Sequence, residues 1–481
     1  MGATFTVPAP GPNEDTIFTL EVWKKHNTSP DLTLAEGWTE IEAETFKNTQ
    51  DLWKIRIPAS VVAIESEAFG DASHLRQVEF AQGSQLEFIG DRAFSGTEAL
   101  ERINIPALVT EIDFETFSGA SSLVEVTFEE DSQLEYIGNR AFMGAIALQR
   151  IRIPSSLEYI GDGAFFNARS LQTIRIPRLV EYIGTQAFEN ATSLREVIFE
   201  EDSQLRSIRD GAFAGTTALQ TIQIPASVRN IGVGAFRNAS GLIEATFEEG
   251  SQLEMIEDGA FSGAIALQRI QIPARVHWIS ASAFADTTNL REITFKKNSR
   301  ISFIDRNAFT GSGLTVVVIV ENVLEVLNDD RMKYDLPPLR FGKNNDFYGA
   351  YNVNIVSITQ EIDMLHLSTR EVGYKDPPRS GFGYVKESLG LMAPREKTRP
   401  PLPRHLTNYA ATFLMPPGVV PKSRQVLEDR RRAIERKSKK KKSKKREEEY
   451  AGGARKSRRR KRGIRRSVRK ASSRRRTMKR K

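Results

Sequence analysis

The sequence predicts a β-rich repeat solenoid, and two observations carry this prediction. A phenylalanine, usually preceded by alanine, returns along more than half of the 481-residue chain. Successive copies lie 23 or 25 residues apart, which is the period of stacked repeat proteins. The anchor residues are Phe46, Phe69, Phe94, Phe117, Phe142, Phe165, Phe188, Phe213, Phe236, Phe261, Phe284 and Phe309. This regularity predicts a parallel stack of about 12 rungs.

Residues 142–165 show what one repeat does. Ile151 and Ile153 are two residues apart, so their side chains point to the same side of a strand. Pro154 ends the strand because proline has no N–H to give to a ladder. A second apolar pair and a turn follow, and Phe165 closes the core. One repeat cannot bury its apolar side alone, so each copy must stack on its neighbours.

Two repeat lengths alternate. The short form has the pattern Ile-x-Ile-Pro-x-x-Val, as in 222–228, and the long form has Val-x-Phe-Glu-Glu-Asp-Ser-Gln-Leu, as in 126–134. The two extra residues fall in the loop after the strand. Two short repeats follow each other between Phe142 and Phe188, which breaks the alternation once.

The full pattern Leu-x-x-Ile-x-Ile-Pro-x-x-Val-x-x-Ile-Gly-x-x-Ala-Phe resembles the BspA-type leucine-rich repeat over roughly residues 40–320. The resemblance implies an adhesion or interaction module and no enzyme. Members of that family occur on bacterial and protist surfaces and in proteins of large DNA viruses, giant viruses among them. The motif is specific for the fold and says little about function.

The rest of the chain is divided by composition. The apolar run 316–320 predicts a closing strand, and residues 321–337, which have apolar spacings of three and four, predict a capping helix. Proline pairs punctuate the following stretch, within which 353–364 could add a strand or a short helix. The predicted units are an N-terminal cap (1–40), the solenoid (41–320), a C-terminal cap helix (321–340), a proline-containing linker (341–421) and a basic tail (422–481).

The charge is divided unevenly between the tail and the rest. Residues 422–481 carry 31 Lys and Arg against 6 Asp and Glu, a net charge of about +25, whereas residues 1–421 carry about −17. A segment of this composition is expected to be disordered when free. The clustered cations that we expect to act in binding or targeting are Lys439, Lys440, Lys441, Lys442, Lys444, Lys445, Arg446, Arg458, Arg459, Arg460, Lys461, Arg462, Arg465 and Arg466.

Such clusters neutralise many phosphates together, which predicts binding to nucleic acid that is independent of base sequence and weakened by salt. Tyr450 is the one aromatic residue among them, so base stacking is not the expected mechanism. The clusters also resemble a bipartite nuclear localisation signal. Three alternatives stay open: a solubilising tail, a tether to anionic lipid, and folding back onto the acidic solenoid.

On the solenoid, the residue that starts each strand faces its counterpart on the next rung. The sign of the charge alternates along this column in two places, which favours pairing between rungs or a polar recognition surface. These strand-face residues are Arg102, Glu125, Arg150, Glu244, Arg269 and Glu292. The loops of the long repeats, such as 129–131 and 200–202, are acidic and predict a solvated ridge in preference to a calcium site.

Several functional classes are excluded or disfavoured. The chain has no cysteine, and its five histidines are scattered without paired ligand spacing. No metalloprotease, hydrolase or phosphate-loop motif is present, so we expect no catalysis, cofactor or metal. We find neither a secretory signal nor an apolar run of about 18 residues. The expected location is intracellular, in the nucleus or a virion, with the chain as a monomer.

The function that follows is a non-enzymatic protein–protein interaction scaffold. The solenoid surface would bind a protein partner, and the basic tail would bind nucleic acid or another polyanion, or direct the chain to a nucleus or virion. The alternative is a cell-surface adhesion module of the BspA-like type.

Overall fold

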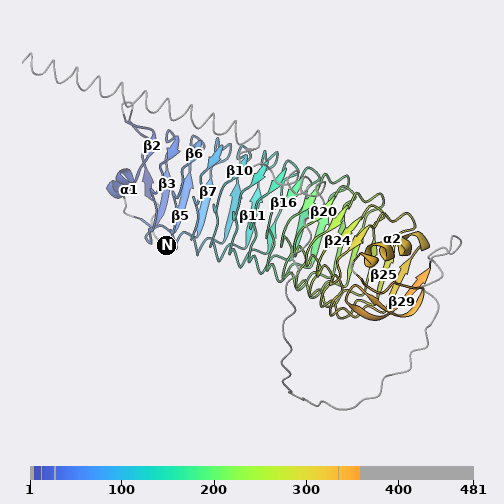
Figure 1. The fold of residues 1–481 in the computed structure, drawn as a ribbon. Helices are drawn as coiled ribbons and strands as arrows, with labels where there is room; N and C mark the ends of the chain where they lie inside the picture. Colours follow the sequence, from blue (N-terminus) through green and yellow to red (C-terminus); the bar gives the residue numbers. More distant parts are fainter. Residues whose placement is uncertain (1–4, 12–13, 27–28, 334, 358–481) are drawn as a thin grey trace, which may run out of the picture. The chain divides into compact units, whose positions relative to one another are not determined.

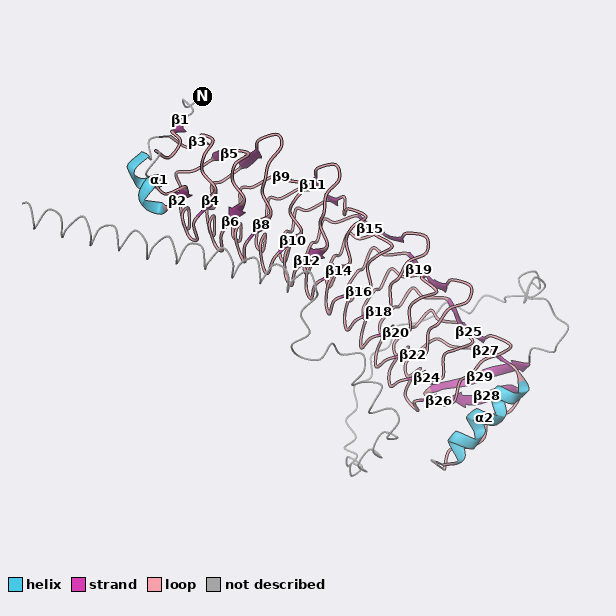
Figure 2. Cartoon of the chain, turned by 90° about the horizontal axis from the view of Figure 1, so that it is seen from above, coloured by secondary structure: helices cyan, strands magenta, loops and turns pink. Residues whose placement is uncertain are grey.

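The computed structural model describes residues 5–11, 14–26, 29–333 and 335–357. They form a parallel β-solenoid of about thirteen turns with little helix, so the predicted fold is confirmed. Each turn contributes one strand to each of two walls, and the turns follow one another in chain order (Figure 1). Seen from above, α1 and α2 lie at opposite ends of the stack (Figure 2).

The first wall, here called the long-strand sheet, is formed mainly by four-residue strands that are paired in parallel. Its strands are β1 (Phe5–Val7), β3 (Asp31–Leu34), β5 (Lys54–Ile57), β7 (Gln77–Phe80), β9 (Arg102–Ile105), β11 (Glu125–Phe128), β13 (Arg150–Ile151), β15 (Thr173–Ile176), β17 (Glu196–Phe199), β19 (Thr221–Ile224), β21 (Glu244–Phe247), β23 (Arg269–Ile272), β25 (Glu292–Phe295), β27 (Val316–Ile319), β28 (Gly342–Phe347) and β29 (Ala350–Ser357). Its ladder is interrupted after β13 and again after β17.

The second wall, the short-strand sheet, is formed by two-residue strands. They are β2 (Ile17–Phe18), β4 (Glu40–Ile41), β6 (Ala63–Ile64), β8 (Phe88–Ile89), β10 (Glu111–Ile112), β12 (Tyr136–Ile137), β14 (Tyr159–Ile160), β16 (Tyr182–Ile183), β18 (Ser207–Ile208), β20 (Asn230–Ile231), β22 (Met255–Ile256), β24 (Trp278–Ile279) and β26 (Phe303–Ile304). The second residue of each strand points into the core, and the first is the more exposed of the two in most of them.

The core is a ladder of phenylalanine rings. Each of the twelve anchors is at most 1 % exposed, and each ring stacks on the next with centroids 4.9 to 5.5 Å apart. Phe18 extends the ladder at the N-terminal end and Phe347 at the C-terminal end. Burial of each ring stabilises the fold by roughly 1.5–3 kcal/mol. The regular spacing in the sequence is therefore the spacing of this ladder.

The N-terminal end is covered by aromatic residues. Trp38 meets the ring of Phe18 edge-on, with centroids 5.2 Å apart, and Trp23 meets Phe46 in the same way at 5.1 Å. Trp23 lies on helix α1 (Leu20–His26), so the cap combines a short strand with a helix.

The C-terminal end extends further than the sequence predicts. Helix α2 (Glu321–Met332) buries Val323, Leu324 and Leu327, as expected for a capping helix. Beyond it, β29 joins β27 in parallel and β28 pairs with β29 in antiparallel orientation. The sheet therefore continues to residue 357, inside the range 341–421 that the sequence analysis assigned to a linker. The buried alternation of Val353 and Ile355 is the physical reason.

Candidate binding surface

The outward face of the long-strand sheet is a set of polar columns, because every second side chain of each strand points away from the core. At the first outward position, Glu125 lies opposite both Arg102 and Arg150. The Nε atoms of these arginines lie 3.9 and 3.7 Å from the carboxylate oxygens of Glu125. The alternation in the sequence thus corresponds to a chain of weak, solvent-exposed ion pairs.

The second run of strand-face residues lies further along the same column. Arg269 faces Glu244 on one side and Glu292 on the other, and its Nε lies 3.8 Å from an oxygen of Glu292. The Arg269 side chain is 75 % exposed, which limits the contribution of such a pair to about 0–1 kcal/mol. These pairs leave the arginine largely available to a ligand.

A stronger network near the N-terminal end escaped the sequence analysis. Glu79 accepts hydrogen bonds of 2.6 Å from both Lys54 and Arg56. Partial burial opposes the effect, but these two donors lower the pKa of Glu79 below its usual value. Arg56 and Glu79 face each other at the second outward position of their strands. The sequence carries this signal in the second outward column, where Arg56 and Glu79 have opposite charges.

The face is hollowed where the alternation of repeat lengths breaks. A hollow of about 360 Å³ lies between the rungs of β13 and β15, which belong to the two consecutive short repeats. β13 contains only two residues, and among the described strands it pairs with β11 alone. The two rungs are therefore not joined by a continuous ladder. The residues that line the hollow are Gln149, Arg150, Ile151, Arg152, Gln172 and Thr173.

The hollow is polar and positively charged. Arg150 and Arg152 line it, and Arg175 takes the equivalent position of Arg152 on the next rung. All three are exposed, and within the described residues Arg150 alone has an ion-pair partner, Glu125. Guanidinium groups of this kind bind carboxylates with two parallel hydrogen bonds. The arrangement thus suits an acidic segment of a partner.

The acidic loops have a structural role that the sequence analysis missed. The first glutamate of each loop accepts a hydrogen bond from a backbone N–H of the preceding rung. Glu129 binds Ala107 N–H at 3.1 Å, and Glu248 binds Ala226 N–H at 2.9 Å. Each carboxylate thus satisfies a backbone group that lies just after a proline. Within the described ranges no cluster of His, Asp and Glu is arranged to hold a metal ion.

Not all predicted site residues can be placed. The six strand-face residues lie on the long-strand sheet as described above. The cations of the tail, from Lys439 to Arg466, lie outside the described residues, as do the tail (422–481) and the rest of the predicted linker. Their proposed roles stay predictions. No helix in the described part of the chain has the length and apolar character needed to cross a membrane.

Comparison with known families decides what kind of repeat this is. The model of the BspA-type leucine-rich repeat region matches residues 39–134, 127–243 and 206–330, which together span more than half of the chain. The chain belongs to this family. The BspA-type match thus covers residues 39–330, which include the hollow but not the first strands or the β28–β29 hairpin. Proteins of this family are typically non-enzymatic binding modules.

Solved structures of leucine-rich repeat proteins resemble the BspA-type solenoid. A leucine-rich cell surface protein of Faecalibacterium prausnitzii is 26 % identical, with 57 % of this chain and 80 % of that chain covered and a TM-score of 0.37. A leucine-rich repeat protein of Bacteroides ovatus is 20 % identical, with coverages of 67 % and 88 % and a TM-score of 0.41. Pneumococcal vaccine antigen PcpA is 18 % identical, with 67 % and 85 % covered and a TM-score of 0.35. No curated protein sequence matches the chain.

Proposed function

We propose that this chain is a protein-binding module that performs no chemistry and holds an acidic segment of its partner on the long-strand sheet. The observation that carries the proposal is the hollow between β13 and β15, lined by Arg150 and Arg152. The family supports it, because BspA-type repeats are typically binding modules. A stacked, rigid face also loses little conformational entropy when a ligand binds.

The test reverses charge on the face and compares it with charge reversal elsewhere. The variant Arg152→Glu with Arg175→Glu changes two exposed arginines of the face. The matched control, Arg178→Glu with Arg275→Glu, changes two exposed arginines in loops that follow the strands. Tagged full-length proteins are used to capture partners from the source cells, and each partner is quantified by mass spectrometry.

We expect at least one acidic partner to be depleted about tenfold in the face variant and retained by the control. Its direct binding is then measured with purified partner. Equal recovery of all partners by the two variants contradicts the use of this face.

The cellular setting of the module has two candidates. The family match supports the adhesion alternative better than the tail-based function, because it concerns the solenoid alone. Protease treatment of intact source cells distinguishes them. Cleavage of the protein on intact cells supports a surface adhesion module, whereas protection until the cells are lysed supports an intracellular scaffold in a nucleus or virion.

For the basic tail we propose binding to nucleic acid through Lys439–Arg446 and Arg458–Arg466. Its support is charge alone. The full chain and residues 1–421 are compared for binding to a DNA duplex at rising salt. We expect the affinity of the full chain to fall at least about a hundredfold between about 50 and about 200 mM salt. Equally weak binding by both chains contradicts the proposal.

A further inference from the structure

The two rungs beside the hollow are joined at one wall and separate at the other. On the short-strand sheet, Tyr159 of β14 pairs in register with Tyr182 of β16. The anchor turns are joined as well, because the N–H of Phe165 donates to the carbonyl of Ala187 at 2.7 Å. On the long-strand sheet, β13 and β15 do not pair. The hollow is therefore a local opening in a stack that is closed elsewhere on the same rungs.

Where neighbouring long strands do pair, backbone groups just before the strands bind each other. Between β11 and β13, the N–H groups of Gln149 and Arg150 donate to the carbonyl of Val124, at 2.9 and 3.4 Å. Between β15 and β17, the N–H of Arg195 donates to the carbonyl of Gln172 at 2.8 Å. The carbonyl before one strand thus accepts from the next rung.

At the hollow this exchange does not take place. By the same pattern, the carbonyl of Gln149 would accept from the N–H groups of Gln172 and Thr173, but neither bond forms. Among the residues that the structure describes, the carbonyl of Gln149 accepts no hydrogen bond and the N–H of Gln172 donates none. Both residues line the hollow. One main-chain acceptor and one main-chain donor therefore lie at its wall, on adjacent rungs.

A peptide unit matches these two groups, because it carries one N–H donor and one carbonyl acceptor. Extended peptides bind at open sheet edges through such main-chain bonds. Water can satisfy the two backbone groups as well, but the side chains around them add a preference for charge. Arg150 and Arg152 lie on one rung and Arg175 on the next. An extended segment with acidic side chains matches both the backbone groups and the arginines.

The following inference rests on the proposed function of this face. We propose that the hollow recognises the main chain of the acidic segment as well as its charge. One peptide unit of the segment donates its N–H to the carbonyl of Gln149 and accepts from the N–H of Gln172. Acidic side chains beside that unit bind Arg152 and Arg175. The ligand is thus a polypeptide, and a polyanion without peptide groups would match the charges alone.

The test needs a readout at the hollow, because the basic tail attracts any acidic peptide. The chain has no cysteine, so Ser155→Cys can carry a single environment-sensitive fluorophore on the full-length protein. Ser155 is exposed and follows β13 by a few residues. Every protein in the test carries this label, and the reference ligand is a peptide of five Glu-Gly repeats.

The first comparison changes the ligand. In a second peptide every glycine is replaced by sarcosine, which keeps the charge and removes the N–H of that residue. We expect the sarcosine peptide to bind about three- to tenfold more weakly than the Glu-Gly peptide, because it cannot donate to the carbonyl of Gln149 at those positions.

The second comparison changes the protein. Gln172→Pro removes the main-chain N–H, whereas Gln172→Ala removes the same side chain and keeps the N–H. We expect Gln172→Pro to bind the Glu-Gly peptide about three- to tenfold more weakly and Gln172→Ala to bind as the wild type does. Gln220→Pro is the matched control. It lies at the break between β17 and β19, where the N–H of Gln220 also donates no backbone bond among described residues, and it should leave binding unchanged.

Two results overturn the inference. One is equal affinity of the wild type for the Glu-Gly and sarcosine peptides. The other is equal affinity of folded Gln172→Pro and Gln172→Ala for the Glu-Gly peptide. Circular dichroism checks that each variant is folded, and for an unfolded Gln172→Pro the two peptides decide.

Charge reversal separates this inference from the proposed function. If Arg152→Glu with Arg175→Glu binds the Glu-Gly peptide as the wild type does, or if the wild type gives no signal, the proposed function fails and the inference fails with it. If charge reversal weakens binding while the sarcosine peptide and Gln172→Pro have no effect, only the main-chain recognition is wrong.

Discussion

The N-terminal and C-terminal halves of the solenoid use different residue types at one repeated backbone position. Two residues before most anchor phenylalanines, the chain must adopt a positive φ angle. From residue 44 to residue 140 this position is charged, as in Glu67, Arg92 and Glu115. From residue 163 to residue 259 it is mostly glycine. The same turn is thus built with charged residues in the first half and mostly with glycine in the second.

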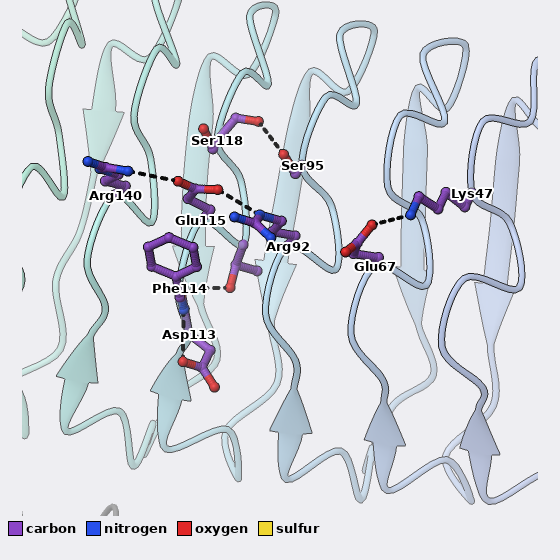
Figure 3. Close-up of polar contacts among 10 residues, drawn as sticks. Lys47, Glu67, Arg92, Ser95, Asp113, Phe114, Glu115, Ser118 and Arg140 are labelled. Carbon is purple, nitrogen blue, oxygen red and sulfur yellow. Dashed lines mark hydrogen bonds and ion pairs between the residues drawn. The ribbon is translucent and has the colours of Figure 1, made fainter. Parts of the chain in front are cut away.

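The charged half links its rungs by ion pairs. Glu115 accepts from Arg92 at 2.7 Å and from Arg140 at 3.3 Å, and Lys47 contacts Glu67 (Figure 3). A non-glycine residue in this conformation costs about 1–2 kcal/mol, and a part-exposed ion pair returns about 0.2–1 kcal/mol. From these magnitudes we expect the charged column to lower stability on balance and to favour the correct neighbouring rung.

The largest expected effect tests whether the halves differ in their cores. Phe94→Ala in the first half and Phe236→Ala in the second each leave a cavity in the same ladder, with stacking distances of 5.3 Å and 5.1 Å to the next ring. We expect each to lower the free energy of unfolding by about 3–5 kcal/mol. Urea unfolding followed by circular dichroism measures both. If the losses in free energy of unfolding for the two variants differed by more than about 1 kcal/mol, the halves would differ in their cores as well as in their turns.

The second effect isolates the backbone term. Gly234 has φ of +58°, and a Cβ atom there would meet nothing closer than 3.5 Å. Gly234→Ala therefore adds strain without a clash, and should cost about 1–2 kcal/mol in urea unfolding. Its control is Ala218→Gly, which exchanges the same two residue types at a half-buried position whose φ is not positive. No left-handed strain is therefore involved in the control. A neutral Gly234→Ala would show that this turn tolerates side chains freely.

The third effect is smaller and has the opposite sign. Arg140 also has positive φ, and its side chain is 56 % exposed. Arg140→Gly removes the strain and one exposed ion pair, so we expect a gain of about 0.5–1 kcal/mol. The gain should be larger at high salt, where the ion pair of the wild type is screened. A loss of stability at every salt concentration would mean that the ion pairs stabilise the charged half after all.

The sequence predicts the parts of this protein that repeat. The anchor spacing fixes the phenylalanine ladder, and the pairing of Arg102 with Glu125 follows once the rungs are in register. It showed the two consecutive short repeats but not the hollow between them, because the hollow depends on a break in the backbone ladder after Ile151. It also could not bring Arg209 to Tyr182, since that contact joins different positions on neighbouring rungs. The sequence allowed a strand within 353–364, which overlaps β29, but it did not predict β28 or the hairpin, because this segment follows no repeat.

The smallest expected effect comes from a carboxylate in the second half, where the turn position is mostly glycine. Burial raises the pKa of Glu257, although a hydrogen bond of 2.6 Å from Asn230 opposes the shift. A carboxyl group whose pKa is raised by folding resists ionisation in the native state. It therefore subtracts stability as the pH rises from its unfolded pKa of 4.5 through its folded pKa, and it has no such effect below 4.5.

Glu257→Gln removes this charge and keeps the side-chain oxygen that accepts from Asn230. We expect it to raise the free energy of unfolding by up to about 0.5 kcal/mol at pH 7, and to change nothing at about pH 4. Glu79→Gln in the charged half should do the reverse at pH 7, because Lys54 and Arg56 lower the pKa of Glu79. Urea unfolding at the two pH values measures both variants. If both glutamates shifted stability in the same direction at pH 7, the halves would not differ in how they use charge.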